Sequence, residues 1–402
     1  MKKAAQNIEN NNRNRKTFSK NLLMILLGCI GIASGIVLAI LPSLLPKEAL
    51  PDLVFPEIPS KTNDTTAIYS NLTGLKLASE AEKNAPAYCI QTPNGTDGAR
   101  PQAGLDQAGV VFEAIAEAGI TRMAAIYQNP TSAVIGPIRS LRLYYLQWDT
   151  PFDCTIVHAG GADDALAAVR SGGYKDLTEN YTYMYRGTAS ARRWNNLFTT
   201  SAYLAQVSAD RGYSSANMRG FTRMTPEEAP RDRVDKTVAE KLEITEPATK
   251  DTSALVAQVG GMTMRFGGMG NYNVHYTYNA TTNSYDRGYE SGASGDIYSC
   301  PTENLGEKNP ENVCTLKVLS PKVVVGMVVS ERKAADNYHE NITTTGSGEA
   351  YVFQNGYMAH GSWRKDTVAD QIKFYDDSGA EIALAPGQTF IEAVPSYGGV
   401  EY

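Results

Sequence analysis

Few side chains in this sequence are suited to hold a metal ion or to attract nucleic acid. The chain has four histidines in 402 residues, and neither these nor the five cysteines show the spacing of a metal site. Its formal net charge is −6, from 37 basic and 43 acidic side chains. Nonspecific binding of nucleic acid requires a basic surface. We therefore expect no metal, no cofactor and no nucleic-acid partner.

Long apolar runs are also missing, with one exception near the N-terminus. Residues 1–20 are polar and basic, whereas in residues 21–45 only small residues and Pro42 interrupt an apolar sequence. About 20 apolar residues cross the hydrocarbon core of a bilayer, and basic residues before such a helix hold that end in the cytoplasm. The sequence predicts a cytoplasmic tail at 1–20, a single-pass transmembrane anchor at 21–45 and an extracytoplasmic remainder.

Two alternatives to this anchor remain open. A cleaved signal peptide usually has an apolar region of only about 7–15 residues, which is shorter than the run seen here. The segment Leu26–Cys29 resembles a lipobox in which Cys29 would be lipidated, although the sequence stays apolar through Ile40. All three interpretations place the bulk of the chain outside the cytoplasmic membrane.

Four cysteines follow the anchor, an even number that permits disulfides outside the cytoplasm. Cys300 and Cys314 enclose a polar loop, and we expect them to be bridged. Cys89 and Cys154 lie in apolar runs, where two buried thiols and a second bridge are both consistent with the sequence.

The sequence after the predicted anchor indicates an α+β fold. We expect two units that each mix helices and strands, with the second unit richer in strands. We expect a Pro-rich linker at 46–67, a first unit at 68–215, a connecting segment at 216–250 and a second unit at 251–402. Hydrophobic periodicity and turn residues predict the elements of the first unit: strands at Ala87–Gln91 and Asp153–His158, a hairpin of Val110–Ala118 with Arg122–Gln128, and helices at Ile138–Gln147 and Asp163–Arg170. The predicted strands of the second unit are Val274–Tyr278, Lys322–Val329, Ala350–Gln354 and Gln371–Tyr375.

The segment Gly136–Arg142 has two arginines where a helix is expected to begin. Proline suits the first helical position, but the N-terminal end of a helix is electropositive and favours Asp or Glu. Arg139 and Arg142 are three residues apart and would share one helix face. An anionic group, either a carboxylate of the protein or a ligand, should therefore compensate them.

Two further arginines, Arg100 and Arg122, also lie beside predicted turns. Arginine recognises carboxylate and phosphate through two parallel hydrogen bonds, so four converging arginines would form an anion pocket. Glu113 and Glu117 offer a structural alternative, because their even spacing on a strand puts them on one face. Ion pairs between these glutamates and the arginines would explain the same residues, and both interpretations stay open.

The segment Thr155–Gly161 predicts a strand followed by a glycine turn and a helix. Ligands of open α/β sheets bind at the carboxyl ends of strands, and Gly160 and Gly161 would let backbone N–H groups approach an anion. His158 would stand at the rim of such a site and could transfer a proton near neutral pH. Alternatively, the glycines only form a turn and the acidic pair Asp163 and Asp164 stabilises the helix start.

Catalytic arrangements have less support in the sequence. Ser140 could join His158 and an aspartate in a triad, but no nucleophile-elbow sequence surrounds it. Glu113 and Glu117 could act as an acid and base on a glycan only with favourable side-chain directions, since strand positions four apart are far from each other.

Several of these motifs also occur together in one known family. They are Tyr69–Gly74, Ala99–Leu105, Glu117–Arg122, Gly136–Arg142 and His158–Gly161 in the first unit, and segments between Gly346 and Thr389 in the second. With these motifs the chain resembles the YerB family of bacterial envelope lipoproteins. It differs from the family's usual Pro-His-Asn segment, where it has Arg193-Trp194-Asn195-Asn196. The resemblance implies a location in the cell envelope and a two-domain architecture. The activity of the family is unknown.

We therefore expect an extracytoplasmic protein that binds an anionic envelope ligand or a protein partner through a rim in its first unit. The expected rim consists of Arg100, Arg122, Arg139, Ser140, Arg142, His158, Gly160 and Gly161. The alternative is a hydrolase or transferase that acts on envelope polymers with His158 and a nearby carboxylate. Such an enzyme needs His158 in an open cleft, whereas a binding protein needs unpaired arginines that face solvent.

Overall fold

The computed structural model describes residues 67–187, 194–229, 261–267, 269–301 and 309–402. All of these residues belong to one compact unit, Thr66–Tyr402. The predicted tail at 1–20, the anchor at 21–45 and the lipidation site at Cys29 lie outside the described residues. Within the described ranges, no helix is both long enough and apolar enough to cross a bilayer.

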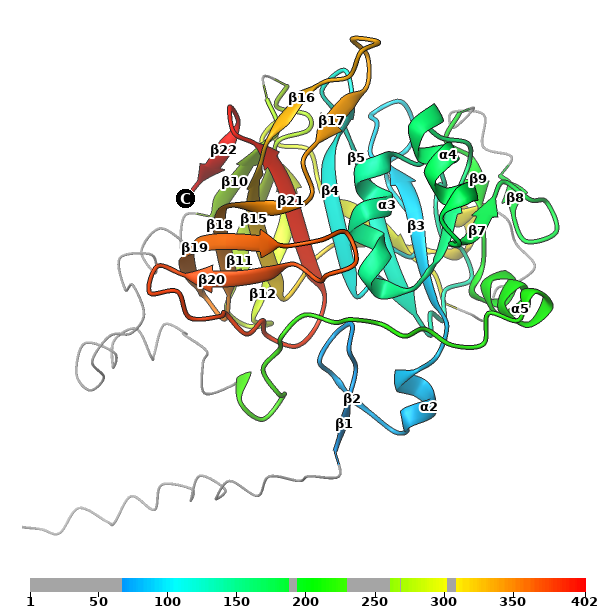
Figure 1. The fold of residues 1–402 in the computed structure, drawn as a ribbon, viewed down its shortest axis with the longest axis horizontal. Coiled ribbons are helices and arrows are strands. Elements are labelled where there is room, and N and C mark those ends of the chain that lie inside the picture. The colour runs from blue at the N-terminus through cyan, green and yellow to red at the C-terminus, as the bar shows by residue number, and fades with distance from the viewer. Residues whose placement is uncertain (1–66, 188–193, 230–260, 268, 302–308) are drawn as a thin grey trace, which may run out of the picture. The chain divides into compact units, whose positions relative to one another are not determined.

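A mixed ten-stranded sheet forms the centre of this unit (Figure 1). Its strand order is β20-β19-β18-β15-β21-β4-β5-β3-β6-β7. The strands are β3 (Ala87–Pro93), β4 (Val110–Glu117), β5 (Ile120–Gln128), β6 (Thr155–His158), β7 (Lys175–Thr178), β15 (Val323–Val329), β18 (Gly346–Gln354), β19 (Tyr357–Lys365), β20 (Lys373–Asp376) and β21 (Thr389–Pro395). Both predicted units contribute strands to this sheet.

The two halves of the sheet meet at β21, which pairs in parallel with β15 on one side and with β4 on the other. Every residue of β21 is buried, and β4 is buried except at its last residue. Strands covered on both faces carry near-continuous apolar sequence, as these two do. The boundaries at 215 and 251 stay a prediction, because residues 230–260 lie outside the described part of the chain.

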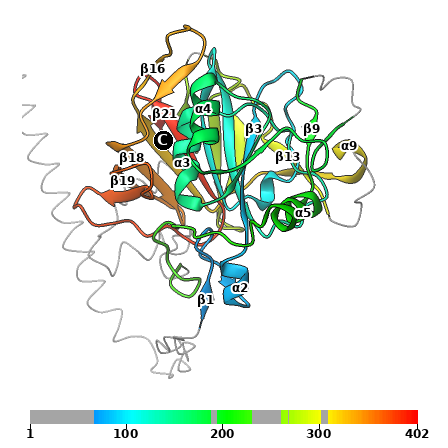
Figure 2. The same ribbon diagram turned by 45° about the vertical axis from the view of Figure 1, so that its right-hand side comes forward.

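Layers on the two faces cover the sheet (Figure 2). Helices α3 (Leu143–Asp149) and α4 (Asp163–Ser171) pack on one face, where Trp148 and Val169 join a core cluster with alternate residues of β4 and β5. Helix α5 (Ser201–Arg211) covers the other face of the first half. In the second half, a four-stranded sheet packs on β15, β18 and β21. Its strands are β10 (Met262–Arg265), β11 (Val274–Asn279), β12 (Ser284–Tyr289) and β22 (Gly399–Glu401).

Short elements complete the described part of the fold. They are β1 (Ile68–Tyr69), β2 (Lys76–Leu77), α2 (Glu80–Lys83), η1 (Leu105–Gln107), η2 (Thr150–Phe152), β8 (Tyr185–Arg186), β9 (Leu197–Phe198), β13 (Asp296–Ser299), α9 (Pro310–Val313), β14 (Thr315–Val318), β16 (Glu331–Lys333) and β17 (Glu340–Ile342). The large sheet and the few helices confirm a mixed α/β fold with a β-rich second half. Among the described residues there are two disulfides: the expected Cys300–Cys314 bridge and a Cys89–Cys154 bridge, which the sequence left open.

The helix predicted at Ile138–Gln147 begins later than expected, at Leu143. The preceding residues are extended and run beside the chain that follows β6: Ala159 N–H donates to the carbonyl of Arg139 and Leu141 N–H to that of Gly160, each at 3.0 Å. Pro137 follows a cis peptide bond and is not a helical residue. The prediction that Arg139 and Arg142 share a helix face is therefore wrong, because tertiary hydrogen bonds hold both residues outside the helix.

Candidate functional site

A cleft of about 660 Å³ lies between the start of α3, the start of α4 and the β16–β17 hairpin. Family-typical motifs form one wall and the hairpin forms the other. Its lining residues are Arg142, Leu143, Tyr144, Gln147, Gly161, Ala162, Asp163, Asp164, Arg332, Ala334, Ala335, Asp336, His339, Glu340, Asn341, Ile342 and Thr343. Of the predicted rim, Arg142 and Gly161 are in this lining. We refer to the space as the cleft.

Arg142, which lines the buried end of the cleft, belongs to an ion cluster with Glu117 and Arg122, and we call this cluster the floor. Glu117 accepts a hydrogen bond from Arg122 at 2.7 Å and from Arg142 at 2.5 Å. Glu117 reaches Arg142 because the register of β4 with β5 shifts between Ile115 and Glu117, a β-bulge that redirects the end of the strand. The prediction that Glu113 and Glu117 share a face is therefore wrong.

The floor carries more positive than negative charge. Burial alone would raise the pKa of Glu117, but Arg122 and Arg142 outweigh burial and hold this pKa below its ordinary value. Burial and the neighbouring Arg142 lower the pKa of Arg122. The Nε atoms of both arginines are buried and have no hydrogen-bond partner among the described residues. One carboxylate thus serves two guanidinium groups.

The β16–β17 hairpin forms the second wall. On one of its faces, Lys333 pairs with Glu340. Arg332 and Asn341 are register partners on the opposite face, and both are exposed. Arg332 has no hydrogen-bond or ion-pair partner within the described ranges. At the tip of the hairpin, Asp336 bonds His339 at 2.6 Å.

The opposite wall carries the acidic start of α4. Asp163 and Asp164 are both exposed and occupy the first turn, where negative charge stabilises a helix. Asp164 also accepts a hydrogen bond from the N–H of Ala165 at 2.7 Å. The side chain of Asp163 has no partner in the part of the chain that the structure describes. Unpaired charges of opposite sign therefore face the cleft from its two walls.

His158 does not stand at the rim of this cleft. Its side chain is 1% exposed, and its ring bonds the carbonyl of Gly160 through Nδ1 at 2.7 Å and Asp176 through Nε2 at 2.8 Å. Both ring nitrogens are therefore engaged within the protein. The glycine turn is also occupied, since Leu141 pairs with residues 160–162. The geometry resembles a structural ion pair more than an accessible general base.

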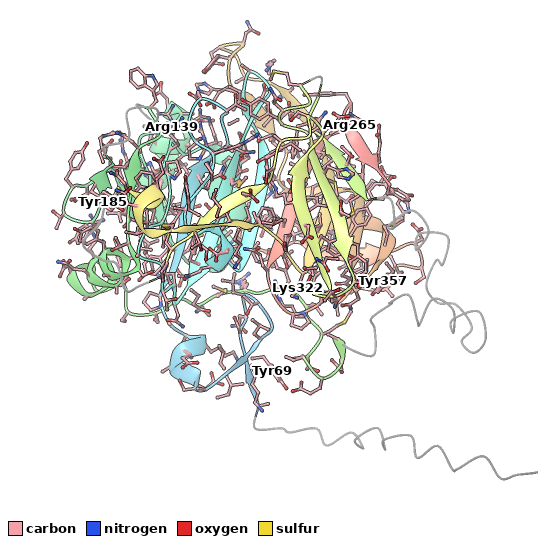
Figure 3. The ribbon with its side chains drawn as sticks, turned by 180° about the vertical axis from the view of Figure 1, so that it is seen from behind. Tyr69, Arg139, Tyr185, Arg265, Lys322 and Tyr357 are labelled. Carbon is pink, nitrogen blue, oxygen red and sulfur yellow. A yellow bond between two sulfur atoms is a disulfide. The ribbon has the colours of Figure 1, made fainter. Side chains whose placement is uncertain are left out.

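The remaining predicted rim residues lie apart from one another. Arg100 stacks on Tyr289, with its guanidinium carbon 3.7 Å from the ring centroid, and donates to Asn94 at 2.8 Å. Arg139 is half-buried, and its side chain has no partner among the described residues (Figure 3). Ser140 contributes its carbonyl, which accepts from Arg122 at 2.8 Å. The four arginines therefore do not converge on one pocket.

A second ion cluster, which we call the core cluster, lies where the two halves of the sheet join. Glu113 accepts from Arg287 at 2.5 Å, and Glu392 accepts from the Tyr276 hydroxyl at 2.5 Å. Glu113 and Glu392 are direct neighbours in the parallel β4–β21 pairing, and both are 0% exposed. Burial, followed by the charge of Glu113, raises the pKa of Glu392 well above its ordinary value.

Sequence reasoning missed the hairpin wall with Arg332 and gave Asp163 and Asp164 only a capping role. The adjacent acidic pair at a predicted helix start was a visible signal for one wall. Nothing in the sequence related it to residues 332–343. Within the described ranges, no group of three or more His, Cys, Asp or Glu side chains is placed to hold a metal ion.

Comparison with known proteins gives matches to both halves of the chain. Family models described as "Protein of unknown function (DUF3048)", N-terminal and C-terminal domain, match residues 72–214 and 262–391. The "Putative lipoprotein YerB" of Bacillus subtilis is 25% identical over 329 residues, which are 81% of this chain and 85% of the relative. The crystal structure of YerB protein from Bacillus subtilis aligns with a TM-score of 0.62 and 20% identity, covering 83% of this chain and 100% of that chain. This likeness shows a shared fold, and each matched domain supplies one wall of the cleft.

Proposed function

Since the chain belongs to the YerB-like DUF3048 family, we propose that it is an extracytoplasmic cell-envelope protein that binds a peptide-like anionic ligand in the cleft. The relative's name describes a lipoprotein, and the predicted anchor at 21–45 also tethers this chain to the cytoplasmic membrane. The relative's name and the predicted anchor both support an envelope location, and we propose a single membrane attachment at the N-terminal end.

The observation that carries the proposal is the surplus positive charge on the floor. Glu117 neutralises one of the two buried guanidinium groups of Arg122 and Arg142. Arginine keeps its proton in proteins, so the second positive charge cannot be removed by titration. A buried charge needs a partner. An anionic ligand group in the cleft supplies that partner, and Arg332 on the facing wall adds an exposed donor fork.

The dimensions and donors of the cleft indicate the class of ligand. Small-molecule sites usually have volumes of about 300–1,000 Å³, and the cleft has about 660 Å³. Arginine forks suit carboxylates as well as phosphates. A peptide-like envelope fragment with free carboxylates has the required charge and the hydrogen-bonding groups to line the remaining polar surface.

Binding without catalysis is the function that the geometry favours. A general base must reach the proton that it abstracts. His158 is buried, both of its ring nitrogens are engaged, and it is absent from the cleft lining. The alternative of a hydrolase or transferase acting through His158 has no accessible group to begin from.

Calorimetric titration tests the proposal with the full chain purified in detergent. The probe is a synthetic peptidoglycan stem pentapeptide that contains lysine, used with free carboxylates and with every carboxylate amidated. We expect the free form to bind at least about tenfold more tightly, a difference of about 1.4 kcal/mol. Arg332→Gln should reduce this preference, because one of the cationic groups of the cleft is lost.

The matched control is Arg170→Gln, which changes an exposed arginine at the far end of α4, outside the cleft lining. It should bind the free peptide like the wild type. Equal affinity of the wild type for the free and amidated peptides would overturn the proposed function, as would unchanged binding by Arg332→Gln.

A further inference from the structure

We infer that the β16–β17 hairpin is a pH-sensitive flap over the cleft, docked while Glu331 carries a proton and released when this carboxyl group ionises. The flap, residues 331–342, contributes one wall of the cleft and its exposed Arg332. Its release would therefore open the site and withdraw a cationic group. The movement is a property of the unliganded fold, whereas its effect on ligand affinity rests on the proposed function.

The flap is joined to the ten-stranded sheet by two short segments. It forms a two-stranded sheet of its own and projects from the upper end of the large sheet in Figure 1. Strand β15 ends at Val329 and β18 begins at Gly346, so only a few residues connect each side. One hydrogen bond closes the base, from the N–H of Thr343 to the carbonyl of Ser330 at 3.0 Å. Such element ends are where hinges are found.

The face of the flap opposite Arg332 covers a second, smaller pocket of about 170 Å³. On this face Lys333 pairs with Glu340, and apolar side chains that include Ile115 and Phe266 form the other side of the pocket. Protein interiors usually contain few voids larger than a water molecule. The docked flap therefore lies over a space that apolar packing does not fill, and polar contacts gain weight in holding it.

Two contacts connect the flap to the strands beside it. Near its base, Glu331 accepts a hydrogen bond at 2.8 Å from the hydroxyl of Tyr397, which lies in the turn between β21 and β22. Near its tip, His339 pairs with Glu117 through an isolated β-bridge. The second oxygen of Glu331, Oε2, is buried and has no hydrogen-bond partner among the described residues. An ionised carboxylate in this position lacks a donor, which is costly.

The charged groups around Glu331 add to this cost. Lys333 is the cation on this face of the flap, and it already pairs with the buried Glu340. Burial, and after it the charge of Glu340, raises the pKa of Glu331 to about 7, although Tyr397 and Lys333 act in the opposite direction. From α3, Tyr144 also faces this group, and burial raises the pKa of its hydroxyl and keeps it neutral.

The sign of the pH effect follows from this raised pKa. Glu331 in the released flap has the ordinary pKa of glutamate, about 4.3, so between this value and about 7 the docked flap binds more protons. Docking is therefore most favourable at acidic pH and loses this contribution as pH rises through about 7. Between pH 6 and pH 8 the docking equilibrium should change about tenfold.

Hydrogen exchange of the unliganded full chain in detergent tests the flap. Mass spectrometry follows peptides from residues 331–345 between pH 5 and pH 8, and protection is corrected for the intrinsic pH dependence of exchange. An isolated two-stranded hairpin is marginally stable, so release should expose its amides. Protection in the wild type should fall about tenfold from pH 6 to pH 8.

Glu331→Gln keeps a neutral side chain at every pH, so its protection should not change over this range. The matched control is Glu80→Gln, which removes an exposed carboxylate on α2 and should behave like the wild type. Tyr397→Phe gives an independent check if Glu331→Gln fails to fold. It removes a donor that lowers the pKa of Glu331, so the loss of protection should move to higher pH.

Two exchange results would overturn the inference. One is wild-type protection that does not vary with pH. The other is unchanged pH dependence in Glu331→Gln, which would assign the effect to His339, the flap's other group able to change charge in this range.

Titration with the free stem pentapeptide separates the flap from the proposed function. Affinity of the wild type should be weaker at pH 8 than at pH 6, because the released flap withdraws Arg332, and Glu331→Gln should bind equally at both. If exchange behaves as expected but no peptide binds at either pH, the proposed function fails and the flap stands. If the peptide binds equally at both pH values, control of the cleft by the flap is overturned.

Discussion

Two glutamates four residues apart on β4 show opposite ways of burying charge. Glu113 belongs to the core cluster, where it and Glu392 share one arginine, Arg287. Glu117 belongs to the floor of the cleft, where Arg122 and Arg142 share one glutamate. The core cluster therefore has a surplus of carboxyl groups, and the floor has a surplus of guanidinium groups.

The chemistry of the two groups makes this difference informative. A carboxyl group can take up a proton, and burial beside Glu113 raises the pKa of Glu392, which favours its neutral form. Guanidinium groups cannot neutralise themselves by losing a proton, because the pKa of arginine ordinarily lies far above any physiological pH. The floor therefore keeps its positive charge. A buried cluster with more guanidinium groups than carboxylates therefore points to an external anion. A buried cluster with more carboxyl groups does not, because it can neutralise itself by taking up a proton.

The largest effect is expected from breaking the core cluster with Arg287→Met. This change leaves Glu113 as a buried carboxylate without its cation, which typically costs about 3–5 kcal/mol of unfolding free energy. Urea denaturation measures the loss. The double variant Glu113→Gln/Arg287→Met should recover part of it because no charge is left unpaired. A loss below about 1 kcal/mol in the single variant would show that Arg287 does not neutralise the cluster.

A somewhat smaller effect is expected from Glu117→Gln, which leaves two guanidinium groups on the floor without a carboxylate. Since Glu117 is partly accessible, we expect a loss of about 2–3 kcal/mol. Inorganic phosphate should then raise the thermal midpoint of this variant more than that of the wild type, because the anion replaces the missing charge. Glu113→Gln is the comparison, and phosphate should not rescue it. Equal responses of the two variants would remove the distinction between the clusters.

The clusters should also respond to pH with opposite signs. Glu392 has a raised folded-state pKa, so the folded protein keeps a proton that the unfolded chain loses above about pH 4.3, and stability falls as pH rises by up to about 1.4 kcal/mol per unit. Glu117 has a lowered pKa, so its contribution is present above the unfolded value and is lost as pH falls through the folded one. Urea titrations from about pH 2 to pH 8 should show a flatter alkaline side for Glu392→Gln and a flatter acidic side for Glu117→Gln. The reverse assignment would contradict both ion clusters.

The smallest effect is expected at Arg139, which lies three residues before Arg142 but outside both clusters. Its side chain is half-buried and makes no hydrogen bond or ion pair with the described residues. Arg139→Ala should change the unfolding free energy by no more than about 0.5 kcal/mol. Arg142→Ala, measured beside it by thermal unfolding, should cost several times more. If the two variants lose similar stability, the pairing with Glu117 is not what distinguishes them.

Strands that are bounded by turn-forming residues or have a continuous apolar sequence could be predicted. The β4–β5 hairpin was located closely because Ala118 and Gly119 form its turn with φ values of 49° and 77°, and glycine favours such a conformation. Strand β15 was found from its continuous apolar run. In both cases the signal is local, since a few adjacent residues determine the turn or the buried strand.

The site was less predictable because distant pairings build it. The bulge that turns Glu117 toward α3 depends on its register with β5, and the late start of α3 depends on hydrogen bonds from residues 139–141 to residues 159–162. Arg332 joins the cleft only because the hairpin folds over the start of α4. The last two of these pairings join residues that no local sequence pattern relates, and the bulge is a register shift that the alternation of apolar residues does not mark.

The central position of β21 has a consequence for the order in which the chain can fold. Residues 389–395 pair with residues 323–329 on one side, and residues 389–392 pair with residues 110–113 on the other, so the two halves of the sheet are not joined until β21 is in place. A growing chain that stops before residue 389 presents the edges of β4 and β15 without their shared neighbour, and exposed strand edges invite aggregation. Pairings so distant along the chain also form slowly. The nascent protein therefore exposes these two strand edges until residues 389–395 have been synthesised, and a truncation that removes β21 should be far more damaging than its length suggests.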